Sequence, residues 1–176
     1  MKRYEEAIDW YFRAIQKDAE YKAPHKNLID VYKALKYSDE QIAELVRKYN
    51  LKADYYYYYT GLGYYDNKEY RKSIELFNKT YGCIETLGKA MEKIYNSHGI
   101  SHDDLRENDK ALEMYRKAIE ANPKYHSAYY NAAIVYKRMS KLEEAKEWYI
   151  KAIKANHRYS YAFNNLGNIY KNEANY

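Results

Sequence analysis

The sequence has 176 residues, of which 47% are hydrophobic and 31% charged, and its formal net charge is +5. This balance is typical of a folded chain and excludes a disordered one, and no apolar run of ~18 residues is present to cross a membrane. The single cysteine, Cys83, excludes an internal disulfide framework, and the N-terminus lacks the apolar core of a signal peptide. We therefore expect a cytoplasmic protein in a reducing compartment.

The N-terminal third predicts three amphipathic helices. Residues 1–20 carry apolar side chains at helical spacing, and residues 22–53 predict a pair of helices. The second helix of that pair begins at Ser38, because Gln41 three positions later completes a capping box. Gln41 and Lys48 have long side chains at positions where the clearest helix pair of the chain, residues 126–157, has small residues. The pair in residues 22–53 should therefore pack less closely. The expected apolar face of residues 1–20 is Tyr4, Ala7, Tyr11, Ala14 and Ile15.

Residues 55–82 predict the next helix pair, which begins with a run of tyrosines from Tyr55 to Tyr59. The chain has 26 tyrosines against 3 phenylalanines and 2 tryptophans. An AT-rich genome would produce this bias towards tyrosine. Tyrosine rings that are exposed as a result would be available as contact residues for a partner. Because a helix turns only part of its circumference toward a core, we expect Tyr57 to pack and Tyr58 and Tyr59 to point toward a groove.

The clearest helix pair lies in residues 126–157, and its pattern recurs elsewhere in the chain at a constant interval. The small–aromatic–small pattern of Ala111, Tyr115 and Ala118 recurs in its second helix as Ala145, Tyr149 and Ala152, with the same separation at each position. Its first helix recurs at the same interval further on, between Ala162 and Tyr170. The second-helix positions are Ala145, Tyr149, Ala152 and Ile153, and the first-helix positions are Ala128, Tyr129, Asn131, Ala133 and Tyr136.

This pattern of small and aromatic residues, together with its interval, resembles the tetratricopeptide repeat, whose period is ~34 residues. The resemblance implies an all-α fold in which antiparallel helix–turn–helix hairpins stack into a right-handed superhelix, an α-solenoid. It also implies that the first helix of each hairpin lines a concave groove. A core made of stacked hairpins allows the whole chain, residues 1–176, to be a single array.

We divide this expected array into six segments. The separation of Ser73 and Ala111 exceeds the ~34-residue period by about four residues, and we place the insertion in a turn near residues 99–107. An apolar stripe from Ile84 to His98 predicts the first helix of that repeat. The chain begins and ends in mid-hairpin, as an excerpt of a longer array would. The segments are a second helix of a partial repeat (1–20), a divergent repeat (22–53), repeats at 55–82, 84–123 and 126–157, and a terminal first-type or capping helix (160–174).

In this family the groove binds extended peptides or a helix of another protein. Asn131 and Asn165 each precede the small packing residue of their helix by two positions, and Asn27 occupies the equivalent place. Because an amide both donates and accepts, repeated asparagines can hold a peptide backbone. The ladder is similar to that of O-linked N-acetylglucosamine transferases, although Tyr59 interrupts it; a purely helix-solvating role is the alternative. The candidate peptide-binding residues are Asn27, Tyr130, Asn131, Lys137, Tyr161, Asn164, Asn165 and Asn168.

The carboxylate clamp that some family members use for chaperone C-termini is not expected here. The clamp needs Lys and Asn one turn apart on one first helix, Asn on the next, and Lys and Arg on a third. In this sequence Lys26 is followed by Asp30, and Tyr59 replaces the second Asn. Tyr161 and Asn165 stand where the two cations belong.

Other functional classes have weaker signals. Lysines are spread along the chain rather than gathered in a stripe, which disfavours nucleic-acid binding. The sequence contains no Gly-rich phosphate loop, no Gly-x-Ser-x-Gly and no His-Glu-x-x-His. His98 and His102 have metal-ligand spacing on a helix, but Gly99 and the turn expected there disfavour a continuous helix, so we expect no metal site.

We therefore interpret the chain as a non-enzymatic protein-interaction scaffold that binds a peptide or partner helix in its groove, with no cofactor. The expected partner is a protein or peptide, not nucleic acid or a membrane. Two alternatives stay open: a substrate-recognition arm of a larger enzyme such as a glycosyltransferase, and a structural subunit of a large assembly.

Overall fold

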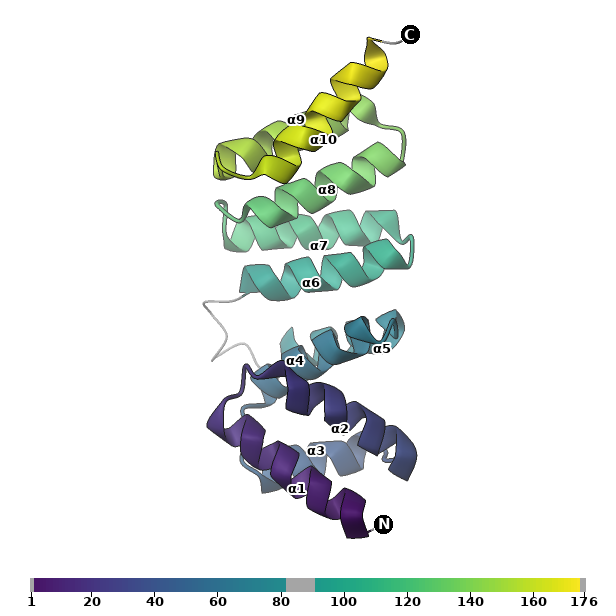
Figure 1. The fold of residues 1–176 in the computed structure, drawn as a ribbon, viewed down its shortest axis with the longest axis vertical. Coiled ribbons are helices and arrows are strands. Elements are labelled where there is room, and N and C mark those ends of the chain that lie inside the picture. The colour runs from purple at the N-terminus through teal and green to yellow at the C-terminus, as the bar shows by residue number, and fades with distance from the viewer. Residues whose placement is uncertain (1, 82–90, 175–176) are drawn as a thin grey trace. The chain divides into compact units, whose positions relative to one another are not determined.

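The computed structural model describes residues 2–81 and 91–174, and these residues form ten α-helices and no β-strand (Figure 1). The all-α fold of helical hairpins expected from the sequence is confirmed. No helix within the described ranges is long and apolar enough to cross a membrane. The helices are α1 (Lys2–Lys17), α2 (Lys22–Leu35), α3 (Asp39–Lys48), α4 (Ala53–Asp66), α5 (Tyr70–Tyr81), α6 (Met91–Asp104), α7 (Asn108–Ala121), α8 (His126–Arg138), α9 (Leu142–Ala155) and α10 (Ser160–Glu173).

The chain divides into two compact units, an N-terminal unit (residues 1–89) and a C-terminal unit (residues 90–176). The N-terminal unit contains α1 to α5, and the C-terminal unit contains α6 to α10. Each unit has its own buried apolar clusters. The single superhelical array over residues 1–176 stays a prediction.

Three helix pairs, α4–α5, α6–α7 and α8–α9, are tightly packed hairpins because a small residue on the first helix faces an aromatic ring on the second. A Cβ atom at Gly61 would lie 2.9 Å from the Phe77 ring, and one at Gly99 would lie 2.6 Å from the Tyr115 ring. In α8–α9 the pair of small and aromatic residues is Ala133 and Tyr149, both fully buried. Close backbone approach in each hairpin therefore depends on these small residues.

Helices α2 and α3 depart from this pattern, in agreement with their sequence. Helix α2 packs closely against α1 and α4 but not against α3. Ile29 is fully buried and points at α4, where its Cδ1 would lie 2.8 Å from a Cβ at Gly63. On α3 the long side chains of Gln41 and Lys48 are exposed. The capping box predicted at Ser38 and Gln41 is present, so α3 is well formed but stands apart from α2.

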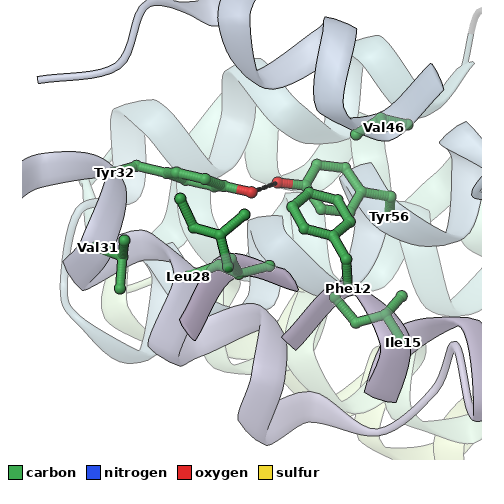
Figure 2. Packing of buried hydrophobic residues seen from close by; sticks show 8 residues of the cluster. Phe12, Ile15, Leu28, Val31, Tyr32, Val46 and Tyr56 are labelled. Atoms are coloured by element: carbon green, nitrogen blue, oxygen red, sulfur yellow. Dashed lines mark hydrogen bonds between the residues drawn. The ribbon is translucent and has the colours of Figure 1, made fainter. Parts of the chain in front are cut away.

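The core of the N-terminal unit is centred on Phe12 (Figure 2), which is fully buried. Its ring stacks on Tyr49 with 4.6 Å between ring centroids. The hydroxyls of Tyr32 and Tyr56 are hydrogen-bonded to each other at 2.9 Å in the same cluster (Figure 2). Helix α1 contributes Ile8, Phe12 and Ile15 to this core, a face with the spacing i, i+4, i+7.

The sequence-based prediction for the α1 face was wrong at its N-terminal end. Tyr4, expected on the apolar face, is 46% exposed. The buried stripe on α1 runs through Ile8 and Phe12, which lie one position C-terminal to the predicted Ala7 and Tyr11. The face is rotated because α1 packs on α2 and on the Tyr49 and Tyr56 rings through the Phe12 side chain.

The prediction for the tyrosine run was partly wrong. Tyr57 packs against the buried cluster as predicted, but Tyr58, expected to face a groove, is buried with its ring 6.0 Å from Phe77. Tyr56 is buried on the opposite side, against Phe12. Helix α4 packs against both α2 and α5, so two faces of α4 are buried instead of one.

The insertion predicted near residues 99–107 is also placed differently by the structure. Helix α6 continues through Gly99 to Asp104, and α7 begins at Asn108. Gly61 is separated from Ser73 by the same length of chain as Gly99 from Ala111, so the two hairpins have the same internal spacing. The additional residues therefore fall between Ser73 and Gly99. The predicted stripe at Ile84, Leu87 and Gly88, like Cys83, lies outside the described residues.

Candidate functional site

Four of the sequence-predicted residues come together on the first-type helices of the C-terminal unit. The Asn131 Nδ2 on α8 donates to the Asn96 Oδ1 on α6 at 2.9 Å. The Asn165 Nδ2 on α10 donates to the Tyr130 hydroxyl on α8 at 3.0 Å. Each asparagine thus reaches back to a residue 35 positions earlier, on the preceding first-type helix. We call the surface formed by Asn96, Tyr130, Asn131, Tyr161 and Asn165 the Asn–Tyr face.

Aromatic rings surround the α8–α10 half of the Asn–Tyr face. The Tyr130 ring lies 5.2 Å from Tyr159 and 6.4 Å from Tyr161, measured between centroids. Tyr161 is 65% exposed, although the Asn165 Nδ2 also donates to its backbone carbonyl at 3.0 Å. Beneath the face, burial raises the pKa of Tyr149, whose hydroxyl has no hydrogen-bond partner in the described part of the chain. The result is a neutral surface of ring faces and amides.

The hydrogen bonds use the amide nitrogens and leave the amide oxygens of two asparagines available. Asn131 and Asn165 are both half-buried, and neither Oδ1 accepts a hydrogen bond from another residue in the ranges 2–81 and 91–174. An Asn carbonyl oxygen accepts from a backbone N–H in the same way as a main-chain carbonyl. The amide nitrogens of Asn131 and Asn165 therefore connect neighbouring first-type helices, while their amide oxygens can accept hydrogen bonds from a ligand.

The other predicted site residues do not join the Asn–Tyr face. Lys137 and Asn168 line a separate apolar pocket of about 130 Å³ together with Leu142 and Ile169, where α8, α9 and α10 meet. Asn164 is exposed on α10. Asn27 is exposed on α2 and belongs to the N-terminal unit.

His98 and His102 form a buried polar cluster on a continuous helix, contrary to the helix break expected at Gly99. Their Nε2 atoms are 3.1 Å apart, and the His102 Nδ1 lies 2.6 Å from a Glu107 carboxylate oxygen. Burial lowers the pKa of His98 to about 3. No set of three or more His, Cys, Asp or Glu side chains is arranged to hold a metal ion within the described ranges. The cluster joins α6 to the turn before α7.

Sequence reasoning missed Asn96 and Tyr159 as members of this region. Asn96 precedes Asn131 by one position more than the ~34-residue period, so alignment of the repeats does not pair it with an asparagine. Helix geometry could have identified Asn96. The side chain of Asn131 contacts the preceding first-type helix one position before the residue that aligns with Asn131 in the repeat.

Comparison with known proteins agrees with this architecture. Residues 92–125 and residues 114–147 each match a family model described as tetratricopeptide repeat. Among curated proteins, the chain is similar to the photosystem I assembly protein Ycf3 of Prochlorococcus marinus subsp. pastoris, with 32% identity over 97 residues, 51% of each chain. The corresponding protein of a Synechococcus species is 30% identical over 91 residues, 52% of each chain. The chain spans about half the length of the curated relatives it matches.

Solved structures with the same fold are distant in sequence. The crystal structure of MamA has a TM-score of 0.58 and 21% identity, covering 89% of this chain and 91% of that one. The first tetratricopeptide domain of Spaghetti (RPAP3), bound to the HSP90 peptide SRMEEVD, has a TM-score of 0.62 and 20% identity, covering 70% and 94%. With the hairpin geometry, the family models identify residues 92–147 as tetratricopeptide repeats, and the solved structures share the fold.

Proposed function

We propose that the protein is a non-enzymatic protein-interaction scaffold whose C-terminal unit binds an extended peptide along the Asn–Tyr face. The single observation that carries this proposal is the pair of available amide oxygens on Asn131 and Asn165. They lie on first-type helices in the same unit, beside the exposed Tyr161 ring. An extended peptide offers backbone N–H groups to such acceptors, and a tyrosine ring adds contact area at low entropy cost.

The similar proteins support an interaction role in general. Ycf3 is described as an assembly protein, and the RPAP3 domain is bound to a peptide. The peptide in question should nevertheless differ from the acidic tail bound by RPAP3. Tyr161 and Asn165 occupy the positions where a carboxylate clamp has cations, so the face offers neutral acceptors and rings in place of positive charge.

The test is capture of peptides from a random display library, followed by fluorescence anisotropy with the selected peptide. The double variant Asn131→Ala/Asn165→Ala should weaken binding about tenfold or more, since two acceptors are lost at ~1 kcal/mol each. Asn78→Ala, at an exposed helical asparagine of the N-terminal unit, is the matched control and should bind normally.

A second double variant separates ligand contact from a structural role of the ladder. Asn131→Asp/Asn165→Asp keeps the acceptor oxygens but removes both donors, and the Asn96 amide and Tyr130 hydroxyl can reorient to donate. Retained binding by the Asp pair together with loss by the Ala pair supports the proposal. Equal binding by all variants overturns it.

A further inference from the structure

A pocket of about 270 Å³ lies within the N-terminal unit, between α3 on one side and α4 and α5 on the other. Its walls are mostly ring faces and aliphatic groups, and its rim carries Asp39, Lys72 and Lys79. It is separate from the Asn–Tyr face, which belongs entirely to the other unit. The walls include Ile42 and Ala43 of α3, Tyr56, Tyr57 and Tyr64 of α4, and Leu76 of α5.

The pocket follows from the displaced position of α3. In the tightly packed hairpins a small residue lets the second helix approach the first, but here Ile29 fills that position and packs on Gly63 of α4. Helix α3 is held at α5 instead, because the Asp39 carboxylate at its first turn accepts from the Lys72 Nζ at 3.1 Å and from the Lys79 Nζ at 2.9 Å. The space is thus maintained by specific contacts on both sides.

The walls offer mostly ring faces and aliphatic groups, although Tyr57, Thr60 and Tyr64 also carry hydroxyls. The Tyr32 and Tyr56 hydroxyls are hydrogen-bonded to each other at 2.9 Å and have no need of a ligand (Figure 2). Burial raises the pKa of Tyr64 to about 12, so its ring stays neutral at physiological pH. Aromatic ligands gain from offset or edge-on contact with such rings in addition to burial of apolar area.

The charges at the rim compensate one another. The Lys72 and Lys79 ammonium groups each contact both carboxylates, Asp39 and Glu75, at 2.9 to 3.1 Å. The Glu40 carboxylate is turned back onto its own backbone N–H and the Ser38 hydroxyl. An anionic ligand would therefore gain a counter-ion only by breaking an existing ion pair.

From this geometry we propose that the pocket binds one uncharged aromatic ring system of about the size of indole. The volume is slightly below the usual range of ~300–1,000 Å³ for ligand pockets, which suits a single ring system and not an extended molecule. The ring can belong to a free small molecule or to a tryptophan side chain of a polypeptide, and both sources present the same chemistry to the walls.

The experiment is methyl NMR of the full chain titrated with indole and with N-acetyl-tryptophanamide. Ring currents should shift the methyl resonances of Ile42, Ala43 and Leu76 saturably, and those of Ile94 and Ile153 in the other unit should not move. Indole-3-acetate should bind about fivefold or more weakly, because its carboxylate competes with carboxylates that are already paired with the lysines at the rim. Binding of indole without N-acetyl-tryptophanamide assigns the site to free molecules; binding of both admits a side chain.

A matched pair of variants controls the assignment. Ala43→Leu fills the pocket and should abolish the shifts, whereas Ala34→Leu, the same change at an exposed position of α2, should leave them intact. Thermal unfolding of both variants shows whether the fold is kept. The proposal is overturned if neither probe shifts the three methyl groups of the wild type at millimolar concentration, or if Ala43→Leu in a folded protein binds as wild type does. Neither result bears on the Asn–Tyr face, because the two sites share no residue.

Discussion

The backbone of Gly99 lies directly against the phenol ring of Tyr115, so that a Cβ atom at position 99 would be 2.6 Å from a ring carbon. Tyr115 lies on α7 and is fully buried, so its ring cannot move aside freely. Gly167 occupies the same repeat position in α10, two periods later, but among the described residues nothing outside its own helix backbone and chain neighbours lies within 4 Å of its Cβ position. The same residue in the same repeat position thus has two different environments.

Gly99→Ala should destabilise the protein by about 1–3 kcal/mol, because overpacking against Tyr115 exceeds the ~1 kcal/mol gain in helix propensity. Gly167→Ala, the matched control, should stabilise it by up to ~1 kcal/mol, because only the propensity gain remains. Urea unfolding followed by circular dichroism measures both. Equal effects at the two positions would contradict the packing shown for Gly99.

Phe12→Ala should destabilise the N-terminal unit by about 3–5 kcal/mol, since the ring is fully buried and stacks on Tyr49 and Tyr56. Trp10→Ala, two positions away at a 68% exposed side chain, should cost less than ~1 kcal/mol. Chemical denaturation compares the two. A larger loss from Trp10→Ala than from Phe12→Ala would contradict the packing of α1 through Phe12.

The buried His98 should make stability fall as the pH is lowered from 6.5 toward 3. The folded-state pKa of about 3 lies below the unfolded value of 6.5, so between these limits the unfolded state binds more protons. One such group contributes a slope of at most ~1.4 kcal/mol per pH unit. His102 on α6 and Glu113 and Lys117 on α7 face this imidazole.

His98→Gln removes this contribution and should flatten the dependence of unfolding free energy on pH between about 6.5 and 4.5. His25, whose pKa burial lowers to about 4, should maintain part of the slope in the variant. His157→Gln, at an exposed histidine, is the control and should leave the slope unchanged. An unaltered slope in His98→Gln would show that the imidazole already titrates normally in the folded protein.

Asp39→Asn should loosen α3 from α5. Hydrogen bonds from Lys79 and then Lys72 hold the pKa of Asp39 at about 2, so the ion pairs persist at neutral pH and are lost only as the pH falls through that value. Because these groups are partly exposed, the expected cost is at most ~1 kcal/mol and should shrink in high salt. Hydrogen exchange should accelerate in α3, whereas Glu40→Gln, at the adjacent exposed carboxylate, should have little effect.

Most of the fold was accessible from the sequence because hairpin packing depends on single small residues at fixed spacing. Ala133 with Tyr149 and Ala111 with Tyr115 mark the buried positions directly, and Ser38 with Gln41 marks the start of α3. The insertion was misplaced because only the second-helix pair Ser73 and Ala111 was compared. The first-helix pair Gly61 and Gly99 shows the same lengthened separation and excludes the turn before α7.

Positions that depend on contacts between helices distant in sequence could not be read from periodicity. Tyr58 is buried because α5 covers a second face of α4, and Phe12 because Tyr49 and Tyr56 close over it. In the candidate site, repeat alignment predicted Asn131 and Asn165, but it gave no indication that their amide nitrogens are bonded to Asn96 and Tyr130.

The hydrogen bond between the Tyr32 and Tyr56 hydroxyls determines the order in which these two tyrosines can be replaced by phenylalanine during evolution. The Tyr56 hydroxyl has a second partner in Thr60, whereas within the described ranges the buried Tyr32 hydroxyl is bonded to Tyr56 alone. Replacing Tyr32 by Phe first leaves no orphaned group, and Tyr56 can follow. The reverse order passes through an intermediate with a buried, unbonded hydroxyl, at a cost of about 1–3 kcal/mol. Descendants with phenylalanine at position 56 alone should therefore be rarer than those with phenylalanine at position 32 alone.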